Sequence, residues 1–139
     1  MIPCVLDASV ALAWVFEDED SPYAEFVIGA LARQRAVVPI IWPFEVLNAL
    51  VAAVRRGRIE EARATPFLSV LDRLPLEIDG EVARGTMGQR LFGLSVRYGL
   101  SAYDASYLEL AIRRGLPLAT LDERLARAAS RAGIEILQP

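Results

Sequence analysis

The sequence predicts an α/β fold in which residues 1–139 form one domain, with a central, mostly parallel sheet of four to five strands flanked by helices. Three observations favour this fold. A chain of 139 residues has the size of a single domain and can bury roughly two-thirds of its unfolded surface. Short apolar runs alternate along the chain with longer segments of helical period. Turn signals recur between them, and no repeat, low-complexity tract or long linker interrupts the alternation.

The beginning of the chain predicts a strand followed by two helices. Cys4–Leu6 is a short apolar run that we expect to form a buried strand, and Ala8–Phe16 has the apolar pattern of a short helix directly after it. Glu17–Asp20 is expected to be a charged loop. A second helix should extend from its N-cap Ser21, which is followed by a proline at the first helical position, to about Arg33.

The middle of the chain predicts a strand, two helices and another strand. Ala36–Pro39 is a β-branched strand, and a helix from Pro43 to Arg56 follows it and ends before a glycine. Residues 59–74 have helical period, but Pro66 inside them predicts a kink or a division. Leu76–Ile78 is expected to be a brief strand.

The last third of the chain continues the alternation. Residues 81–98 have helical period but contain three glycines, which predicts a short or broken helix. Ser101 suits the N-cap of a helix that extends to Arg114 and ends at a glycine. We expect a strand at Pro117–Leu121, a helix at Asp122–Ala132 and a final strand at Glu135–Leu137.

Two residue types that support many kinds of catalysis are missing. The chain contains no histidine, and all 15 of its positively charged residues are arginine. A Ser-His-Asp triad, a Cys-His nucleophile, a histidine-based zinc site, paired-histidine RNA cleavage and Schiff-base chemistry are therefore excluded. Carboxylate chemistry remains. The net charge of −3 is not typical of a nucleic-acid binder, so such binding would need a local arginine surface.

Composition also bears on location and partners. No apolar run approaches the ~18 residues that span a bilayer, and the first residues lack the features of a signal peptide. We therefore expect a soluble, cytoplasmic protein. The lone cysteine, Cys4, lies in an apolar strand and should belong to the core. Hydrophobic residues make up 54% of the chain, so part of this surplus should cover a partner surface.

Four acids are predicted at strand ends or helix starts: Asp7, Glu45, Asp104 and Asp122. Because the carboxyl ends of parallel strands meet at one edge of a sheet, where ligands bind, we expect these side chains to lie close together. Unpaired carboxylates crowded there would repel one another, and a divalent cation would relieve the repulsion. Each acid taken alone also has an ordinary structural explanation, as an N-cap or as a partner of a helix dipole.

Four sequence blocks, each containing one of these acids, cover nearly the whole chain in order: Val5–Val10, Pro43–Leu50, Leu100–Tyr107 and Leu118–Leu125. On these blocks the sequence resembles the PIN-domain ribonucleases, and within them the VapC toxins of bacterial toxin–antitoxin pairs. By that resemblance the four acids match the acidic quartet of the family. Three polar residues match positions around the quartet: Ser9, Asn48 and Thr120.

The resemblance implies a metal-dependent endoribonuclease that hydrolyses RNA phosphodiester bonds with Mg²⁺ or Mn²⁺, ions that hard oxygen ligands select. The three aspartates are expected near the metal, with Glu45 as a ligand or as the base that orients water. Ser9 and Thr120 are expected to contact water or phosphate, and Asp7→Asn should abolish cleavage while sparing the fold. The resemblance further implies a homodimer and a cognate antitoxin that blocks the acidic pocket.

The residues that would contact RNA are less clearly marked. Five arginines could bind phosphate or could be ordinary partners of a helix C-terminus, and the last two fit the second role better: Arg55, Arg56, Arg58, Arg113 and Arg114. Four aromatic residues fit a core or a partner interface better than base stacking: Trp14, Phe16, Trp42 and Phe44.

Two enzyme classes that also place an aspartate after the first strand are excluded. A phosphatase of the haloacid dehalogenase type needs a second aspartate two residues later, where this chain has Ser9, and it needs a lysine. A phospho-receiver domain needs the same lysine. Two alternatives stay open: a nuclease of the same superfamily that processes RNA, and a non-catalytic interaction module whose acids serve only as caps.

Overall fold

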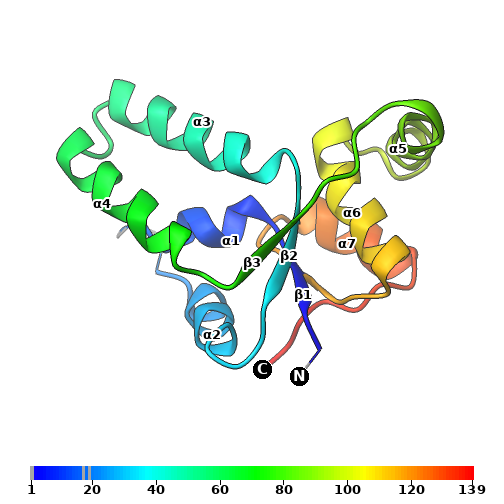
Figure 1. Cartoon of the computed structure of the whole chain (residues 1–139), viewed down its shortest axis with the longest axis horizontal. Coiled ribbons are helices and arrows are strands. Elements are labelled where there is room, and N and C mark those ends of the chain that lie inside the picture. Colours follow the sequence, from blue (N-terminus) through cyan, green and yellow to red (C-terminus); the bar gives the residue numbers. More distant parts are fainter. Residues whose placement is uncertain (1, 17, 19) are drawn as a thin grey trace.

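The computed structural model describes residues 2–16, 18 and 20–139. Within them, the centre is a four-stranded, all-parallel sheet in the order β3-β2-β1-β4 (Figure 1). The strands are β1 (Cys4–Leu6), β2 (Ala36–Pro39), β3 (Leu76–Asp79) and β4 (Leu118–Ala119). The predicted α/β fold with a parallel sheet is confirmed. The predicted loop at Glu17–Asp20 lies partly outside the described residues, because positions 17 and 19 are not among them.

Helices cover both faces of the sheet in the described part of the chain (Figure 1). One side carries α1 (Ala8–Ala13), α2 (Pro22–Ala30), α3 (Trp42–Arg55) and α4 (Glu61–Asp72). The other side carries α5 (Gly85–Tyr98), α6 (Ala102–Arg114) and α7 (Glu123–Arg131). Helix α6 packs directly on β1, β2 and β4. Strands covered on both faces read as continuous apolar runs, as β1 and β2 do.

Strand β1 lies inside the sheet and fixes the edge at which the site forms. Val5 pairs with Val37 of β2 on one side and with Leu118 of β4 on the other. Cys4 is fully buried, and burial raises the pKa of its thiol to about 11. The thiol therefore stays protonated at neutral pH, and its predicted place in the core is confirmed.

Helix α5 is longer and more regular than the sequence predicts. Gly88 and Gly93 lie inside one continuous helix, so the prediction of a short or broken element was wrong. Met87 and Leu91, one turn apart, are buried, and the helix packs against α6. Burial of this apolar stripe outweighs the low helix propensity of glycine.

Pro66 does not divide α4, which continues through it. The buried residues of this helix include Ala64 and Leu71, whereas Pro66 lies on the exposed face. The carbonyl that Pro66 leaves without an intrahelical partner is that of Ala62, an exposed residue, where water can replace the lost bond.

Several element ends also differ from the prediction. Helix α1 ends at Ala13 and α2 at Ala30, each three residues earlier than expected. Strand β4 has only two residues, and the expected strand at Glu135–Leu137 is reduced to a single parallel bridge between Ile136 and Leu118. Element ends are the least certain part of any assignment from sequence. None of the described helices is long and apolar enough to cross a membrane.

Candidate active site

Asp7 lies at the carboxyl end of β1, where its backbone amide donates to the carbonyl of Ala119 in β4 (2.9 Å). Its side chain is only 5% exposed. Oδ2 accepts two hydrogen bonds, from Ser9 Oγ (2.6 Å) and from Thr120 Oγ1 (2.7 Å). Asp7 also stands at the N-cap of α1, but its carboxylate makes no capping hydrogen bond there. An N-cap role therefore does not explain this residue.

The hydroxyls of Ser9 and Thr120 join the ends of β1 and β4. Ser9 Oγ accepts from the amide of Leu121 (3.0 Å), and Thr120 Oγ1 accepts from the amide of Asp122 (3.0 Å). Each hydroxyl has one proton, which it donates to Asp7 while it accepts from the backbone. Two of the three predicted supporting residues thus contact Asp7, the most buried of the four acids, and orient its carboxylate.

The other three acids come from helix starts. Glu45 lies in the first turn of α3. Asp104 lies in the first turn of α6, and its amide donates to the N-cap hydroxyl of Ser101 (3.1 Å). Asp122 is the N-cap of α7, and its Oδ1 accepts from the amide of Leu125 (3.0 Å). The cap uses only one carboxylate oxygen, so Asp122 can cap its helix and still bind a ligand through the other.

The carboxylates influence one another electrostatically. The pKa values of Asp7, Glu45 and Asp104 are all raised above their ordinary values, in each case mainly because burial penalises the charged form. Negative neighbours raise them further. Asp122 acts on Asp7 and Asp104, while Asp7 and Asp104 both act on Glu45. The structure therefore brings all four acids, distant in sequence, within electrostatic range of one another.

Tyr107 also belongs to this group, although the sequence predicts no role for it. It is fully buried in α6, one turn after Asp104, and its phenol donates to Glu45 Oε1. Burial raises the pKa of the phenol far above its usual range, so it keeps its proton and remains a donor. Its three-residue spacing from Asp104, which places both on one helix face, was the available signal. In contrast, Asn48 is exposed on α3 and makes no hydrogen bond to these acids within the described residues.

Oxygen donors of this kind suit Mg²⁺ or Mn²⁺, but the side chains are not pre-arranged around one ion. In residues 2–16, 18 and 20–139, no three acids lie close enough to hold a single metal ion as they stand. Three of the carboxylates instead accept hydrogen bonds from protein donors, through Oδ2 of Asp7, Oε1 of Glu45 and Oδ1 of Asp122. These bonds leave a second oxygen on each carboxylate. Since Mg²⁺ usually keeps several waters and binds one or two carboxylates, the donor set fits such an ion.

Comparison with known proteins identifies the fold family. A family model for the PIN domain matches residues 4–131. The chain belongs to the PIN domain family. Ribonuclease VapC3 of Pyrobaculum aerophilum is 32% identical to it over 126 residues, which cover 88% of this chain and 91% of that protein.

Two Mycobacterium tuberculosis proteins are also similar to this PIN domain. Ribonuclease VapC3 is 37% identical over 125 residues, covering 89% of this chain and 85% of that protein. Ribonuclease VapC1 is 33% identical over 130 residues, covering 92% of each. The crystal structure of PAE2754 from Pyrobaculum aerophilum matches with a TM-score of 0.69 and 26% identity, over 91% of this chain and 79% of that one. The resemblance to VapC ribonucleases is confirmed.

Tyr107→Phe should alter the titration of Glu45 in this PIN domain. The phenol hydrogen bond lowers the pKa of Glu45 against the effect of burial, so its removal should raise that pKa further. The free energy of unfolding should fall by about 1 kcal/mol, because the half-buried Glu45 loses a hydrogen-bond partner. Carboxyl ¹³C NMR of the two proteins across pH measures the first effect. Tyr103→Phe, on an exposed residue of the same helix, should leave the Glu45 signal unchanged, and an unchanged signal in Tyr107→Phe would contradict the assigned bond.

Proposed function

We propose that this protein is a Mg²⁺- or Mn²⁺-dependent endoribonuclease that hydrolyses RNA phosphodiester bonds and acts as the toxin of a toxin–antitoxin pair. The proposal takes residues 1–139 as one PIN domain. One observation carries it: the four acids lie within electrostatic range of one another. Asp7 and Asp104 raise the pKa of Glu45, and Asp122 raises the pKa values of Asp7 and Asp104. Such crowding is relieved by a divalent cation. The relatives named Ribonuclease VapC support RNA as the substrate.

Each residue of the site has a distinct proposed task. Asp7, Asp104 and Asp122 would hold the ion, with Glu45 as a further ligand or as the base. When bound, such an ion lowers the pKa of a coordinated water and neutralises charge on the phosphodiester. Ser9 and Thr120 keep the Asp7 carboxylate in one orientation through Oδ2.

Glu45 is suited to receive the proton of the attacking water. Its raised pKa brings its proton affinity closer to that of a base working near neutral pH. The phenol of Tyr107 donates to Oε1 and leaves Oε2 to face the water. A carboxylate held by one fixed donor loses little rotamer freedom when it takes up the proton.

A homodimer and a cognate antitoxin are the proposed partners, and the cytoplasm is the proposed location. Five large apolar side chains are exposed on α3 and α5: Phe44, Leu47, Val51, Phe92 and Val96. The three on α3 and the two on α5 are three or four residues apart, so each set shares one face of its helix. Exposed apolar faces of this kind mark protein interaction sites.

One observation favours a non-catalytic alternative. Asp122 is a working N-cap and Asp104 lies in a first turn, so both have structural tasks without any metal. An interaction module would keep these tasks and cleave nothing. Metal-dependent cleavage therefore separates the two functions.

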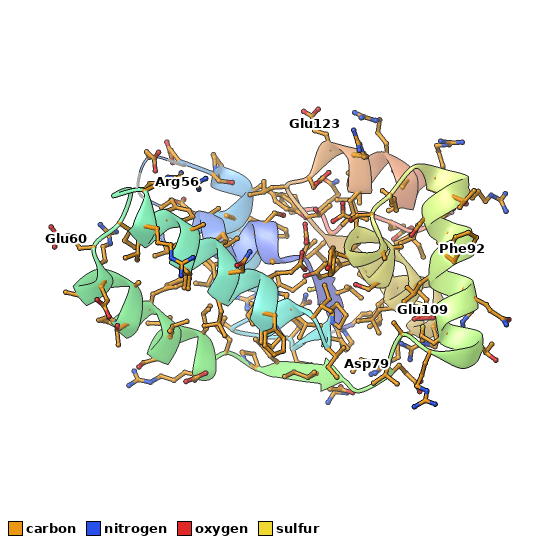
Figure 2. All side chains as sticks on the ribbon, turned by 90° about the horizontal axis from the view of Figure 1, so that it is seen from above. Arg56, Glu60, Asp79, Phe92, Glu109 and Glu123 are labelled. Carbon is orange, nitrogen blue, oxygen red and sulfur yellow. The ribbon has the colours of Figure 1, made fainter. Side chains whose placement is uncertain are left out.

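Purified protein should cleave RNA with Mg²⁺ or Mn²⁺, and a chelator should lower the rate by about 100-fold or more, because charge on the phosphodiester is then not neutralised. Total RNA serves as substrate, and sequencing of the new ends locates the cuts. Asp104→Asn should lower the cleavage rate as much as the chelator does. Glu123→Gln is the matched control, since Glu123 adjoins Asp122 but its side chain is 90% exposed and points outward (Figure 2).

Two outcomes would count against the proposal. Cleavage that persists in chelator would remove the metal from the mechanism. Cleavage that is equal in the wild type and in Asp104→Asn would indicate a contaminating nuclease, and the interaction module would become the better explanation.

A further inference from the structure

A second cavity lies next to the acids, between the end of β2 and helices α5 and α6. Its volume is about 130 Å³. Most of its wall is apolar, and the apolar residues that line it include Pro39, Ile41, Met87, Leu91, Tyr103 and Leu110. Two links join it to the acid site. Tyr103 directly precedes Asp104, and the carbonyl of Ile41 accepts the amide of Glu45 (3.0 Å). We call this cavity the Tyr103 pocket.

A groove between α5 and α6 adjoins the Tyr103 pocket and carries positive charge. Its volume is about 450 Å³, and Arg90, Arg97 and Arg113 line it. Glu109 and Arg113 belong to the walls of both cavities, so the two are neighbours. From above, Glu109 lies between the two helices (Figure 2). We call this cavity the arginine groove.

We propose that the Tyr103 pocket binds one pyrimidine base of the RNA beside the cleaved bond, while the adjoining phosphate chain crosses the arginine groove. This inference rests on the proposed ribonuclease function and adds the substrate contacts. The size of the pocket selects the base. A dry apolar cavity of roughly 150 Å³ holds one benzene ring, so about 130 Å³ suits a single six-membered ring better than a purine.

The chemistry of the walls distinguishes a base from a phosphate. Tyr103 is 62% exposed and offers a ring face at the mouth of the pocket. Single-stranded RNA is recognised by stacking of splayed bases on such rings. The exposed Glu81 also lines the pocket, and its carboxylate repels a phosphate but can accept an N–H donor from a base. The carboxylates of Asp79 and Glu109, in contrast, are held by Arg113. A phosphate would instead be drawn to the arginine groove.

Charge complementarity also favours RNA over a protein partner. An apolar side chain would fill the Tyr103 pocket equally well, but it would have no use for Arg90 and Arg97 in the adjoining groove. Arg113, the third arginine there, is held by Asp79 and Glu109. A nucleotide has both a base ring that fits the pocket and, next to it, a phosphate that suits the groove. Arg97 makes a cation–π contact with Tyr98 (5.5 Å). Arg90 lines the same groove, and its half-exposed side chain lies 3.7 Å from the carboxylate of Glu109.

Ala83→Phe tests the Tyr103 pocket by filling it. Ala83 lines the pocket from an exposed loop, so the larger ring can enter without disturbing the core. The matched control is Ala62→Phe, on the exposed face of α4. The probe is a fluorescein-labelled 12-nucleotide RNA around a cut site mapped with the active enzyme. Its affinity is measured on the Asp7→Asn protein, with the flanking base changed in turn to cytosine, uracil, adenine, guanine and an abasic site.

Ala83→Phe and Tyr103→Ala should each weaken binding of the pyrimidine probe by about 5- to 100-fold, the size of one lost base stack. Tyr103→Phe keeps the ring and should stay within about twofold of the parent, as should Ala62→Phe. The abasic probe should bind equally weakly to all of them. Arg97→Gln should weaken every probe alike and lower the salt dependence by about one charge, whereas Arg73→Gln, at the exposed end of α4, should not.

Distinct results would overturn the inference. If the wild type cleaves RNA but Ala83→Phe and Ala62→Phe bind it alike, the pocket proposal fails while the ribonuclease stands. Cut sites without a flanking pyrimidine would have the same meaning. Loss of binding to a protein partner, with RNA affinity unchanged, would turn the Tyr103 pocket into a protein-docking site. If the wild type cleaves no RNA at all, the proposed function and the pocket fail together.

Discussion

Asp7→Asn should reduce RNA cleavage by about 100-fold or more and at the same time stabilise the fold at neutral pH. The loss of activity follows from removing the most buried carboxylate of the site. The gain in stability follows because the amide oxygen can still accept from Ser9 and Thr120, whereas the buried charge and its repulsion by Asp122 disappear. We expect the free energy of unfolding to increase by about 1–2 kcal/mol, which corresponds to a rise in Tm of several degrees.

The stability gain should depend on pH with a defined sign. Because the pKa of Asp7 is raised in the folded protein, the folded state binds more protons than the unfolded state between the ordinary and the raised value. Wild-type stability therefore falls as pH rises through that window. The advantage of Asp7→Asn should be largest above the window and vanish below about pH 4, where aspartate is protonated in both states.

Thermal unfolding of the wild type and Asp7→Asn, in chelator and over a series of pH values, measures this effect. Glu123→Gln serves as the control, since its side chain is almost fully exposed, and it should give no gain at any pH. A lower Tm for Asp7→Asn at neutral pH would contradict the prediction. So would an advantage that grows on acidification.

Arg113→Ala should destabilise the fold by about 3 kcal/mol or more. The guanidinium donates to both oxygens of Asp79 (2.9 and 3.0 Å) and through Nε to both oxygens of Glu109 (3.0 Å each). The side chains of these acids are only 10% and 5% exposed. Truncation would leave two nearly buried carboxylates without their main partner. Removing one partner of a buried ion pair is costly because the remaining charge is buried and uncompensated.

Acidification should reduce that loss. Arg113 holds the pKa of Asp79 below its ordinary value, mainly through these hydrogen bonds. The stability that this ion pair contributes is therefore fully present above the ordinary pKa, and it is lost as pH falls through the lowered pKa. Urea unfolding of Arg113→Ala at neutral and acidic pH measures both effects. Arg114→Ala is the matched control. Its main partner, Glu77, is 36% exposed, and such a pair contributes about 1 kcal/mol or less. Equal losses in the two variants would show that burial does not set the difference.

The ion pairs also revise how these two arginines are explained. From sequence, Arg113 and Arg114 were candidates for binding phosphate or for complementing a helix C-terminus. The structure engages both with acids of β3, and Arg113 with Glu109 of its own helix as well. Local spacing does not predict the partners in β3, which lie 34 to 37 residues away in the sequence. Their pairing depends on how the fold places the end of α6 relative to β3.

Local signals identified most helices and strands because they depend on chemistry within a few residues. Ser21 and Ser101 are N-caps whose hydroxyls accept from an amide three residues on. Gly115 ends α6 in the left-handed region, with φ of +63°, as a glycine at that position does. The predicted breaks at Pro66 and at the glycines of α5 were wrong because they considered only chemistry within a few residues. Their local cost is real, but buried neighbours such as Met87 and Leu91 offset it.

The sequence by itself determined the parallel α/β architecture and the placement of Asp7, Glu45, Asp104 and Asp122 at strand ends and helix starts, since periodicity and capping act over a single turn or strand. Only the tertiary structure decided what holds each carboxylate. The bond from Thr120 to Asp7 spans 113 residues and that from Tyr107 to Glu45 spans 62. Contacts across such separations depend on how β1, β4, α3 and α6 pack together, and packing is a property of the whole core.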